Sequence, residues 1–342
     1  MSELRSDMIV NRWVIISPRR GARPHDYKND ERAKMQPGPC AFCPNHEHET
    51  GPETFAIRED GKLRGPCWRV RVVANKYPAV ATDVESSDGL CVYSNGVFEG
   101  CKLPGFGSHE VVVETPDHYK TFTQLPMAQI EDVFKAYQAR VTCLSQDKRF
   151  KFVQVFKNHG NAAGASMSHS HSQIIALPVV TKSMEEAVAG TKSYFERTHR
   201  CVLCDIIHQD LVTCRDRLVA ESPFCIAVCP YAPCFPHETW ILPRTHNSNF
   251  ATVPADQING AAKMLKTLLL KMEKAFHLPP YNFMLHTALL DDCHVPYYHW
   301  YIRIVPHLIT VAGFELGSGC YINPVSPEDS AQLLSNTNVD DY

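Results

Sequence analysis

Two Cys-x-x-Cys pairs with matched histidines downstream constrain this chain more than any other sequence feature. The first pair is Cys40 and Cys43, and the second is Cys201 and Cys204. Several features of the first half recur 128 residues later: the His-Glu dipeptide at 109, the histidine at 118, Gln-Ile at 129 and the proline at 178. Matches that keep one order and one spacing indicate an internal duplication.

The two Cys pairs lie 161 residues apart, more than the spacing of the other matches. The first half therefore carries extra residues between its Cys pair and its first matched strand. The segments GKLRGPCWR and ESSDGLCVYSNG are rich in turn formers and are typical of such an insertion.

The expected secondary structure repeats as well. In each half a β-run (109–114 and 237–242) precedes a histidine, a helix follows (127–144 and 255–276), and two more β-runs end at the matched proline. The second helix has an apolar stripe at helical spacing. The order CxxC–β–α–β–β, occurring twice, predicts an α+β fold of two half-domains, 1–178 and 179–342, each an antiparallel sheet with packed helices.

The Cys pairs and histidines have the composition of structural zinc sites, which are tetrahedral and commonly Cys₂His₂. The expected ligand sets are Cys40, Cys43, His118 and His169 in the first half, and Cys201, Cys204, His246 and His299 in the second. At the strict spacing, His299 pairs with His171 rather than His169, so His286 and His294 remain alternatives for the last ligand. An isolated CxxC is also compatible with a redox pair or two buried thiols.

The densest chemistry lies in residues 155–178, VFKNHGNAAGASMSHSHSQIIALP. Alternate residues of a strand share a face, so His169, His171 and Gln173 are expected to form one polar row. The small residues before them let backbone N–H groups approach an anion. A neutral imidazole is a competent nucleophile toward phosphorus, whereas a glutamine donates hydrogen bonds without acid–base chemistry. The alternative is that these histidines lie on the surface or only bind metal.

These motifs resemble the galactose-1-phosphate uridylyltransferase family of the histidine-triad superfamily, with its His-x-His-x-Gln strand. The resemblance covers nearly the whole chain, through RWVIISPRRGARP, CAFC, NKYPAV, the PDH at His118, QVFKN, GASMSHSHSQ, CVLC and GFELGSGCYINPVSPED. GASMSHSHSQ and the second CxxC are most similar to the ADP-glucose phosphorylase branch. The resemblance implies two histidine-triad-like halves related by a pseudo-twofold axis.

The resemblance also implies roles for individual residues. His171 would be the nucleophile, and Gln173 would assist it by holding the α-phosphate. The residues expected to contact substrate are Arg20 and Arg23 (phosphates), Asn75 and Asn158 (nucleotide), Gly164, Ala165, Ser166 and Gln173 (α-phosphate), and Gly313, Phe314 and Glu315 in a C-terminal loop (hexose). Guanidinium forks match phosphate geometry in any family, although a solvated basic loop would look the same.

The implied reaction is nucleotidyl transfer through a nucleotidyl-histidine, with two structural Zn²⁺ ions. The preferred form converts ADP-glucose and phosphate to ADP and glucose 1-phosphate. Uridylyl transfer from UDP-glucose to a hexose 1-phosphate such as galactose 1-phosphate is the alternative, and a histidine-triad nucleotide hydrolase is a weaker one. The sequence does not choose adenine over uracil, because no side chains of the base pocket can be identified.

Charge and hydropathy exclude other classes of partner. The 342 residues carry a formal net charge of −3, without the basic excess that nucleic-acid binding needs. No apolar run reaches the roughly 18 residues of a membrane span. The charged N-terminus does not resemble a signal peptide, so a cytoplasmic location is expected. Uridylyltransferases are typically dimers, which leaves a homodimer open.

Overall fold

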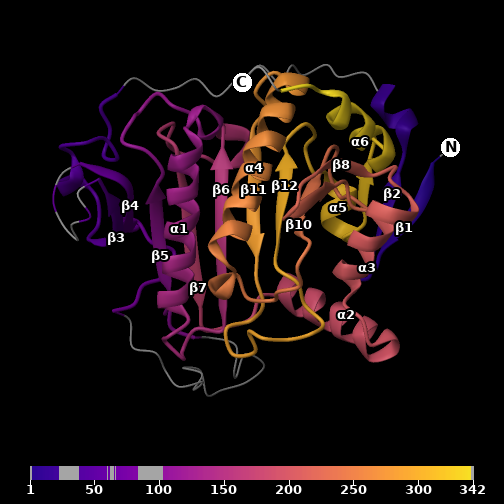
Figure 1. The fold of residues 1–342 in the computed structure, drawn as a ribbon, viewed down its shortest axis with the longest axis horizontal. Coiled ribbons are helices and arrows are strands. Elements are labelled where there is room, and N and C mark those ends of the chain that lie inside the picture. Colours follow the sequence, from indigo (N-terminus) through magenta and orange to yellow (C-terminus); the bar gives the residue numbers. More distant parts are fainter. Residues whose placement is uncertain are drawn as a thin grey trace.

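A single sheet of ten strands runs through both halves of the chain (Figure 1). The computed structural model describes residues 2–22, 38–59, 61, 65, 67–83 and 103–339. The strand order is β3-β4-β5-β7-β6-β11-β12-β10-β9-β8, and neighbouring strands are antiparallel throughout. The predicted α+β class with antiparallel pairing is therefore confirmed. The two halves do not form separate sheets, because β6 pairs with β11 at the centre.

Each half supplies five consecutive strands to this sheet. The first half provides β3 (Glu53–Arg58), β4 (Trp68–Ala74), β5 (Ser108–Val113), β6 (Phe152–His159) and β7 (His171–Leu177). The second provides β8 (Leu218–Glu221), β9 (Cys225–Val228), β10 (Thr239–Pro243), β11 (Tyr281–His286) and β12 (Tyr301–Pro306).

The two long helices predicted from the sequence are confirmed and cover one face of the sheet (Figure 1). The helices are α1 (Met127–Leu144), α2 (Lys182–Thr198), α3 (Val202–His208), α4 (Ala255–Phe276), α5 (Gly313–Ser318) and α6 (Pro327–Asn336). Apolar residues of α1 and α4, such as Val133 and Leu265, are fully buried against alternate strand residues such as Ile174 and Ile302. Burial of this apolar area is the main stabilisation of the fold.

The opposite face is covered differently in the two halves. In the second half, α2, α3 and the turn after the first strand form an apolar cluster with Trp240 and Tyr301. In the first half, the CxxC segment packs Phe42 against Trp68 and Val113. The side chains of β7 that point away from α1 therefore lie beside the first Cys pair.

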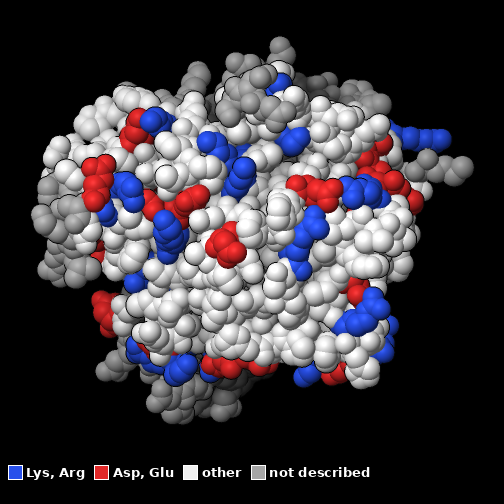
Figure 2. All heavy atoms as spheres, viewed as in Figure 1, with Lys and Arg blue, Asp and Glu red and all other residues white. Residues whose placement is uncertain are grey.

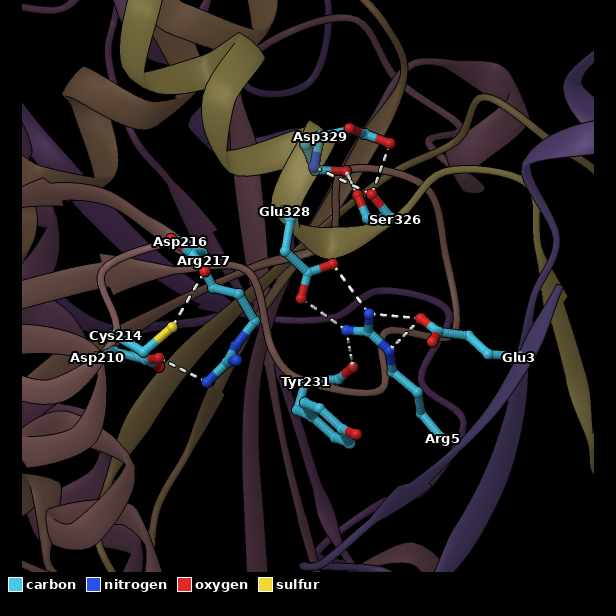
Figure 3. A network of polar contacts seen from close by, with 11 residues as sticks. Glu3, Arg5, Asp210, Cys214, Asp216, Arg217, Tyr231, Ser326, Glu328 and Asp329 are labelled. Carbon is cyan, nitrogen blue, oxygen red and sulfur yellow. Dashed lines mark hydrogen bonds and ion pairs between the residues drawn. The ribbon is translucent and has the colours of Figure 1, made fainter. Parts of the chain in front are cut away.

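A small second sheet joins the ends of the chain. Its strands are β1 (Glu3–Asp7), β2 (Arg12–Ile16) and β13 (Tyr321–Asn323), in the order β1-β2-β13. Figure 3 shows how Arg5 ties this sheet to α6: its guanidinium donates to both carboxylate oxygens of Glu328 at 2.8 and 3.0 Å. The same guanidinium donates to the carbonyl of Tyr231 at 3.2 Å. Bidentate geometry of this kind fixes relative orientation.

The β-run predicted from position 237 starts two residues late. Strand β10 begins at Thr239, because His237 has a positive φ of 58° and turns the chain. In the first half the matching His109 lies within β5. The duplicated sequence therefore has different local backbone at the two His-Glu positions.

On the face shown in Figure 2, over α1 and α4, Lys and Arg alternate with Asp and Glu rather than forming a basic stripe. Among the helices that the structure describes, none is both long and apolar enough to cross a membrane.

His237 supplies a test of how burial sets pH dependence. Its side chain packs on Phe276 at 4.4 Å between ring centroids, and Nδ1 is buried with no partner in the part of the chain that the structure describes. Burial lowers the pKa of His237 to about 4. As pH falls, His237 is protonated in the unfolded chain before it is protonated in the folded protein. Its contribution to the unfolding free energy is therefore complete above pH 6.5 and is lost as pH falls toward 4. His237→Asn keeps a side chain that tolerates positive φ. We expect the loss of unfolding free energy between pH 7.5 and 5 to be smaller in the variant by roughly 2 kcal/mol.

Urea unfolding at both pH values measures this difference. Other groups that titrate between these pH values affect both proteins equally and cancel in the comparison. An equal loss in the two proteins would contradict the assignment of a neutral, buried His237.

Candidate active site

Strand β7 presents His171 and Gln173 on the face opposite α1. The intervening Ser172 points the other way and forms a 2.7 Å hydrogen bond with the hydroxyl of Tyr137 on α1. His171 retains 7% exposure, and its ring lies 5.3 Å from that of Phe42. The alternation expected of a strand thus places both polar side chains beside the CxxC segment.

The hydrogen bonding of His171 fixes its tautomer. Nδ1 lies 2.8 Å from the carbonyl oxygen of His169, which only accepts, so Nδ1 carries the proton. Burial lowers the pKa of His171, and the charge of Lys157 lowers it further. The ring is therefore neutral near pH 7, and its lone pair is on Nε2. Among the described residues, none forms a hydrogen bond with Nε2, which leaves it available to a substrate.

A fully buried ion pair lies behind His171. Nζ of Lys157, 1% exposed, donates to Glu114 at 2.6 Å and to the carbonyl of His171 at 2.8 Å. Glu114, 0% exposed, also accepts from Ser170 at 2.6 Å and from Tyr137 at 3.3 Å. The pair and its donors hold the backbone of 170–171 from the side that the substrate does not reach.

Gln173 is oriented by His109. The backbone N–H of Ala79 donates to Nδ1 of His109 at 3.1 Å, so in the neutral ring the proton is on Nε2. Nε2 donates to Oε1 of Gln173 at 2.8 Å. The amide nitrogen of Gln173 is therefore left to donate to a substrate oxygen. Asn75, expected to contact the nucleotide, lies beside the same ring, with Nδ2 3.1 Å from Nε2 of His109. Both nitrogens are donors in this tautomer, so the contact is not a hydrogen bond.

A glycine-containing turn connects β6 to the nucleophile segment. Gly160 and Gly164 have φ values of 82° and 85°, which other residues adopt at a cost. A Cβ at Gly160 would also lie 2.9 Å from Pro280. Asn158 lies against this turn, 3.5 Å from the carbonyl of Gly164, and its Oδ1 accepts from Asn282 of β11 at 2.8 Å. Ala165 and Ser166 follow, half-buried and exposed respectively.

The first predicted ligand set comes together as one Cys₂His₂ group. The sulfurs of Cys40 and Cys43 are 3.8 Å apart, and Nδ1 of His169 lies 3.5 and 3.7 Å from them. Nδ1 of His118 lies 3.4 Å from Cys43. Around a tetrahedral zinc these separations are about 3.8 Å for two sulfurs and about 3.6 Å for sulfur and nitrogen. His169 donates from Nε2 to the carbonyl of Thr115 at 2.7 Å, which turns Nδ1 toward the group.

The second group contains Cys201, Cys204, His246 and His299. Nδ1 of His246 and of His299 lie 3.4 and 3.6 Å from Cys204. His299 therefore completes it, and the alternatives His286 and His294 do not belong to the group. His286 instead stacks on Tyr301, with ring centroids 4.4 Å apart. Nε2 of His299 is buried and has no hydrogen-bond partner among the described residues, unlike that of His169.

Some predicted substrate residues are not brought to His171 within one chain. Arg20 is exposed in a single turn after β2, and Phe314 is 51% exposed at the start of α5. Figure 1 places α5 and β2 beyond β10, away from β7. The expected C-terminal loop is a short helix, because Glu315 accepts from the N–H of Ala312 at 3.1 Å and Gly319 ends it at φ 68°. Arg23 lies outside the described residues.

Sequence reasoning missed the residues that support the site from behind. Lys157 and Glu114 gave no signal, because a charged residue in a strand is normally solvated. The contact of Phe42 with His171 was not predictable either, because the CxxC motif specifies only its two cysteines. His109 was noticed only as a repeat marker, and its contact with Gln173 depends on the β5–β7 register, which pairs Val111 with Gln173.

Comparison with known proteins identifies the class of enzyme. The family described as galactose-1-phosphate uridyl transferase, N-terminal domain, matches residues 1–181, and a domain of unknown function, DUF4921, matches residues 110–338. ADP-glucose phosphorylase of Arabidopsis thaliana is 39% identical, with 98% of this chain and 93% of the relative covered. Galactose-1-phosphate uridylyltransferase of Thermotoga maritima is 28% identical, with 99% of this chain and 100% of the relative covered.

Solved structures agree with these matches. A crystal structure of the Arabidopsis thaliana ADP-glucose phosphorylase with bound ADP-glucose superposes with a TM-score of 0.86 at 38% identity, covering 99% of each chain. A uridylyltransferase structure gives a TM-score of 0.75 at 26% identity, covering 98% of each chain. The chain belongs to the galactose-1-phosphate uridylyltransferase family. It is a nucleotidyltransferase of the type that ADP-glucose phosphorylase and the uridylyltransferases share.

The buried pair behind His171 predicts non-additive stability effects. Lys157→Met leaves the carboxylate of Glu114 buried without its cation, and we expect a loss of about 3–5 kcal/mol in unfolding free energy. Adding Glu114→Gln removes the uncompensated charge and should recover at least half of that loss. Lys135→Met, in a half-exposed pair with Asp132, is the control and should cost under about 1 kcal/mol.

Urea unfolding of the wild type, Lys157→Met, Glu114→Gln and the double variant measures the cycle, and Lys135→Met is unfolded beside them as the control. A double variant no more stable than Lys157→Met alone would show that the two side chains are not energetically coupled.

Proposed function

We propose that this protein is an ADP-glucose phosphorylase, which converts ADP-glucose and phosphate to ADP and glucose 1-phosphate. The observation that carries the proposal is a neutral His171 with Nε2 unpaired, on the same strand face as a Gln173 amide whose nitrogen is left to donate. The choice of ADP-glucose is supported by the full-length similarity to the Arabidopsis thaliana enzyme at 39% identity, against 28% for the Thermotoga maritima uridylyltransferase.

The proposed mechanism has two displacements at one phosphorus. Nε2 of His171 attacks the α-phosphorus of ADP-glucose, the bond to glucose 1-phosphate breaks, and an adenylyl-histidine remains. An oxygen of inorganic phosphate then attacks the same phosphorus, the N–P bond breaks, and ADP leaves. While the bond exists the ring is cationic, and its Nδ1–H bond to the carbonyl of His169 stabilises that charge.

Gln173 favours transfer over hydrolysis. Its amide donates to a phosphoryl oxygen in both displacements but takes no proton from water. An attacking phosphate needs no base, because it is already an anion near pH 7. The hydrolase alternative would need a proton acceptor at the position that Gln173 occupies.

We further propose that both Cys₂His₂ groups hold structural zinc. Sulfur–sulfur and sulfur–nitrogen separations of 3.4–3.8 Å in the groups match a tetrahedral set. Burial lowers the pKa of His169 to about 4, which keeps it in the neutral form that binds metal. Zinc supplies cross-linking here, since four protein ligands complete its shell. Its effect on catalysis would be to fix His169, whose carbonyl orients His171.

The chain is proposed to have arisen by duplication, with halves at 1–178 and 179–342. The central pairing of β6 with β11 and the five consecutive strands on each side support this. Helix α5 lies away from β7 within one chain. Its residues Gly313, Phe314 and Glu315 can therefore contact the hexose only if a second copy of the chain brings them to His171. A homodimer is therefore part of the proposal.

Isotope exchange tests the proposed reaction. With ADP-glucose and labelled glucose 1-phosphate but no phosphate, we expect label to enter ADP-glucose, because the first displacement is reversible in the absence of the second acceptor. His171→Ala should lower exchange at least 10³-fold. His277→Asn, at the exposed end of α4, is the matched control and should exchange normally.

Three outcomes would contradict the proposal. Full isotope exchange by the His171→Ala variant would show that His171 is not the nucleophile. Faster turnover of UDP-glucose with galactose 1-phosphate would favour the uridylyltransferase alternative. Release of AMP at an undiminished rate without any acceptor would favour a hydrolase.

Metal content tests the two zinc sites separately. We expect two zinc ions per chain by elemental analysis, and one in either Cys40→Ser or Cys201→Ser. Cys40→Ser should lose exchange at least tenfold, because His169 no longer holds His171. Cys201→Ser should keep exchange and lose mainly thermal stability. Equal effects of the two variants on exchange would show that the first site has no special link to His171.

A further inference from the structure

A second polar cavity lies on the face of the sheet that carries His171, but in the other half of the chain. Its volume is about 100 Å³, and its walls come from the turn after β1, α2 and the strands β10 and β12. Tyr301 and Arg303 of β12 line it, while the alternate residues Ile302 and Ile304 face the core under α4. The cavity has no part in the mechanism above.

Strand β12 repeats the layout of the nucleophile strand with different chemistry. His169 is followed two and four residues later by His171 and Gln173, and His299 by Tyr301 and Arg303. In the registers, Gln173 lies opposite Val111 on β5, and Arg303 lies opposite Trp240 on β10. If the chain is a duplication, as proposed, the cavity holds the position in the second half that the His171 site holds in the first.

This second position lacks a nucleophile. A phenol replaces the imidazole at Tyr301. Its hydroxyl can donate or accept a hydrogen bond, but it lacks the basic nitrogen lone pair of a neutral imidazole. The cavity is built for binding rather than for transfer.

Among the charged residues and Tyr301 that line the cavity, the unused polar atoms are mostly donors. His286 also lines it, with Nε2 buried and without a partner among the described residues. Arg303 donates from Nε and Nη2 to Glu238 at 2.7 and 3.0 Å, which leaves Nη1. Arg12 donates only from Nη1, to the sulfur of Cys234 at 3.3 Å. Within the described ranges, no hydrogen bond is made by Nε or Nη2 of Arg12 or by the hydroxyl of Tyr301. Two guanidinium groups and a phenol thus offer free N–H and O–H groups to one cavity.

The acceptors around the cavity are largely occupied. Both oxygens of Glu238 are used, since they also accept from Trp240 at 3.0 Å and from the N–H of Cys234 at 3.1 Å. Asp7 uses Oδ1 for the N–H groups of Ile9 and Val10, at 2.8 and 3.2 Å, which leaves Oδ2. A ligand rich in acceptors with a hydroxyl for Asp7 satisfies this arrangement, and guanidinium forks select oxyanions.

We propose that this cavity is a second ligand site, separate from His171, which binds a phosphoryl group of inorganic phosphate or of a sugar phosphate. Arg12, Arg303 and Tyr301 donate to its oxygens, and Asp7 accepts from a phosphate or sugar hydroxyl. The cavity volume of about 100 Å³ accommodates a phosphate group. The proposal needs the cavity and its donors, and it stands whichever nucleotide sugar the His171 site uses.

Equilibrium binding to the zinc-loaded, full-length protein tests the proposal, with labelled inorganic phosphate in one arm and labelled glucose 1-phosphate in the other. We expect two sites per chain in the wild type. Tyr301→Phe removes a hydroxyl with no partner in the described chain, so it should fold normally and weaken the second site about tenfold. Arg12→Gln should weaken it further, with isotope exchange at His171 unchanged in both variants.

His171→Asn is the matched control and should keep the second site. Two sites in both arms show that the phosphoryl group alone suffices, and two sites only with glucose 1-phosphate show that the sugar is also needed. A single site in both arms, or a second site unaffected by Tyr301→Phe and Arg12→Gln, would overturn the proposal. Either failure leaves the exchange reaction intact, so it is distinguishable from failure of the proposed function.

Discussion

The structure around the candidate site depends on how the backbone at 169–171 is held. The side chain of His169 belongs to the first Cys₂His₂ group, and its carbonyl accepts from Nδ1 of His171. From behind, Lys157 donates to the carbonyl of His171 and pairs with Glu114. Each of these interactions is local, but together they fix the ring, its tautomer and its charge before substrate arrives. Such preorganisation lowers the barrier to transfer, because the groups that hold the nucleophile and stabilise charge in the transition state are already in place.

The two halves share one arrangement of strands but carry different side chains at corresponding positions. Both carry a Cys₂His₂ group beside a strand, on the face of the sheet opposite α1 and α4. Only the first half has an imidazole and an amide at the next two positions of that face, and only its last histidine is oriented by a carbonyl, that of Thr115. The second half has Tyr301 and Arg303 there, and the N-terminal strands and α2 cover it. One half is thus suited to chemistry and the other to stability and binding.

Much of this could be predicted from the sequence, and the rest has identifiable physical reasons. The helices at 127–144 and 255–276 followed from apolar periodicity. The spacing of Cys and His gave the first ligand set and three members of the second, but it left His299, His286 and His294 as candidates for the last position. The joining of the halves into one sheet was not predictable, because the β6–β11 pairing leaves no local pattern. Lys157 and Glu114 were missed because a buried ion pair has the composition of two solvated residues. The separation of α5 from β7 could not be predicted, because a sequence motif does not show how far apart two segments lie in the folded chain.

In the proposed mechanism His171 reacts through Nε2, because Nδ1 donates a hydrogen bond to the carbonyl of His169. The most direct measurement is the ³¹P NMR spectrum of the protein trapped with ADP-glucose in the absence of phosphate, combined with peptide mapping of the modified residue. We expect one phosphoramidate signal, from an adenylyl group on Nε2 of His171. A signal from an Nδ1 linkage, or an adenylyl group mapped to any other residue, would contradict it.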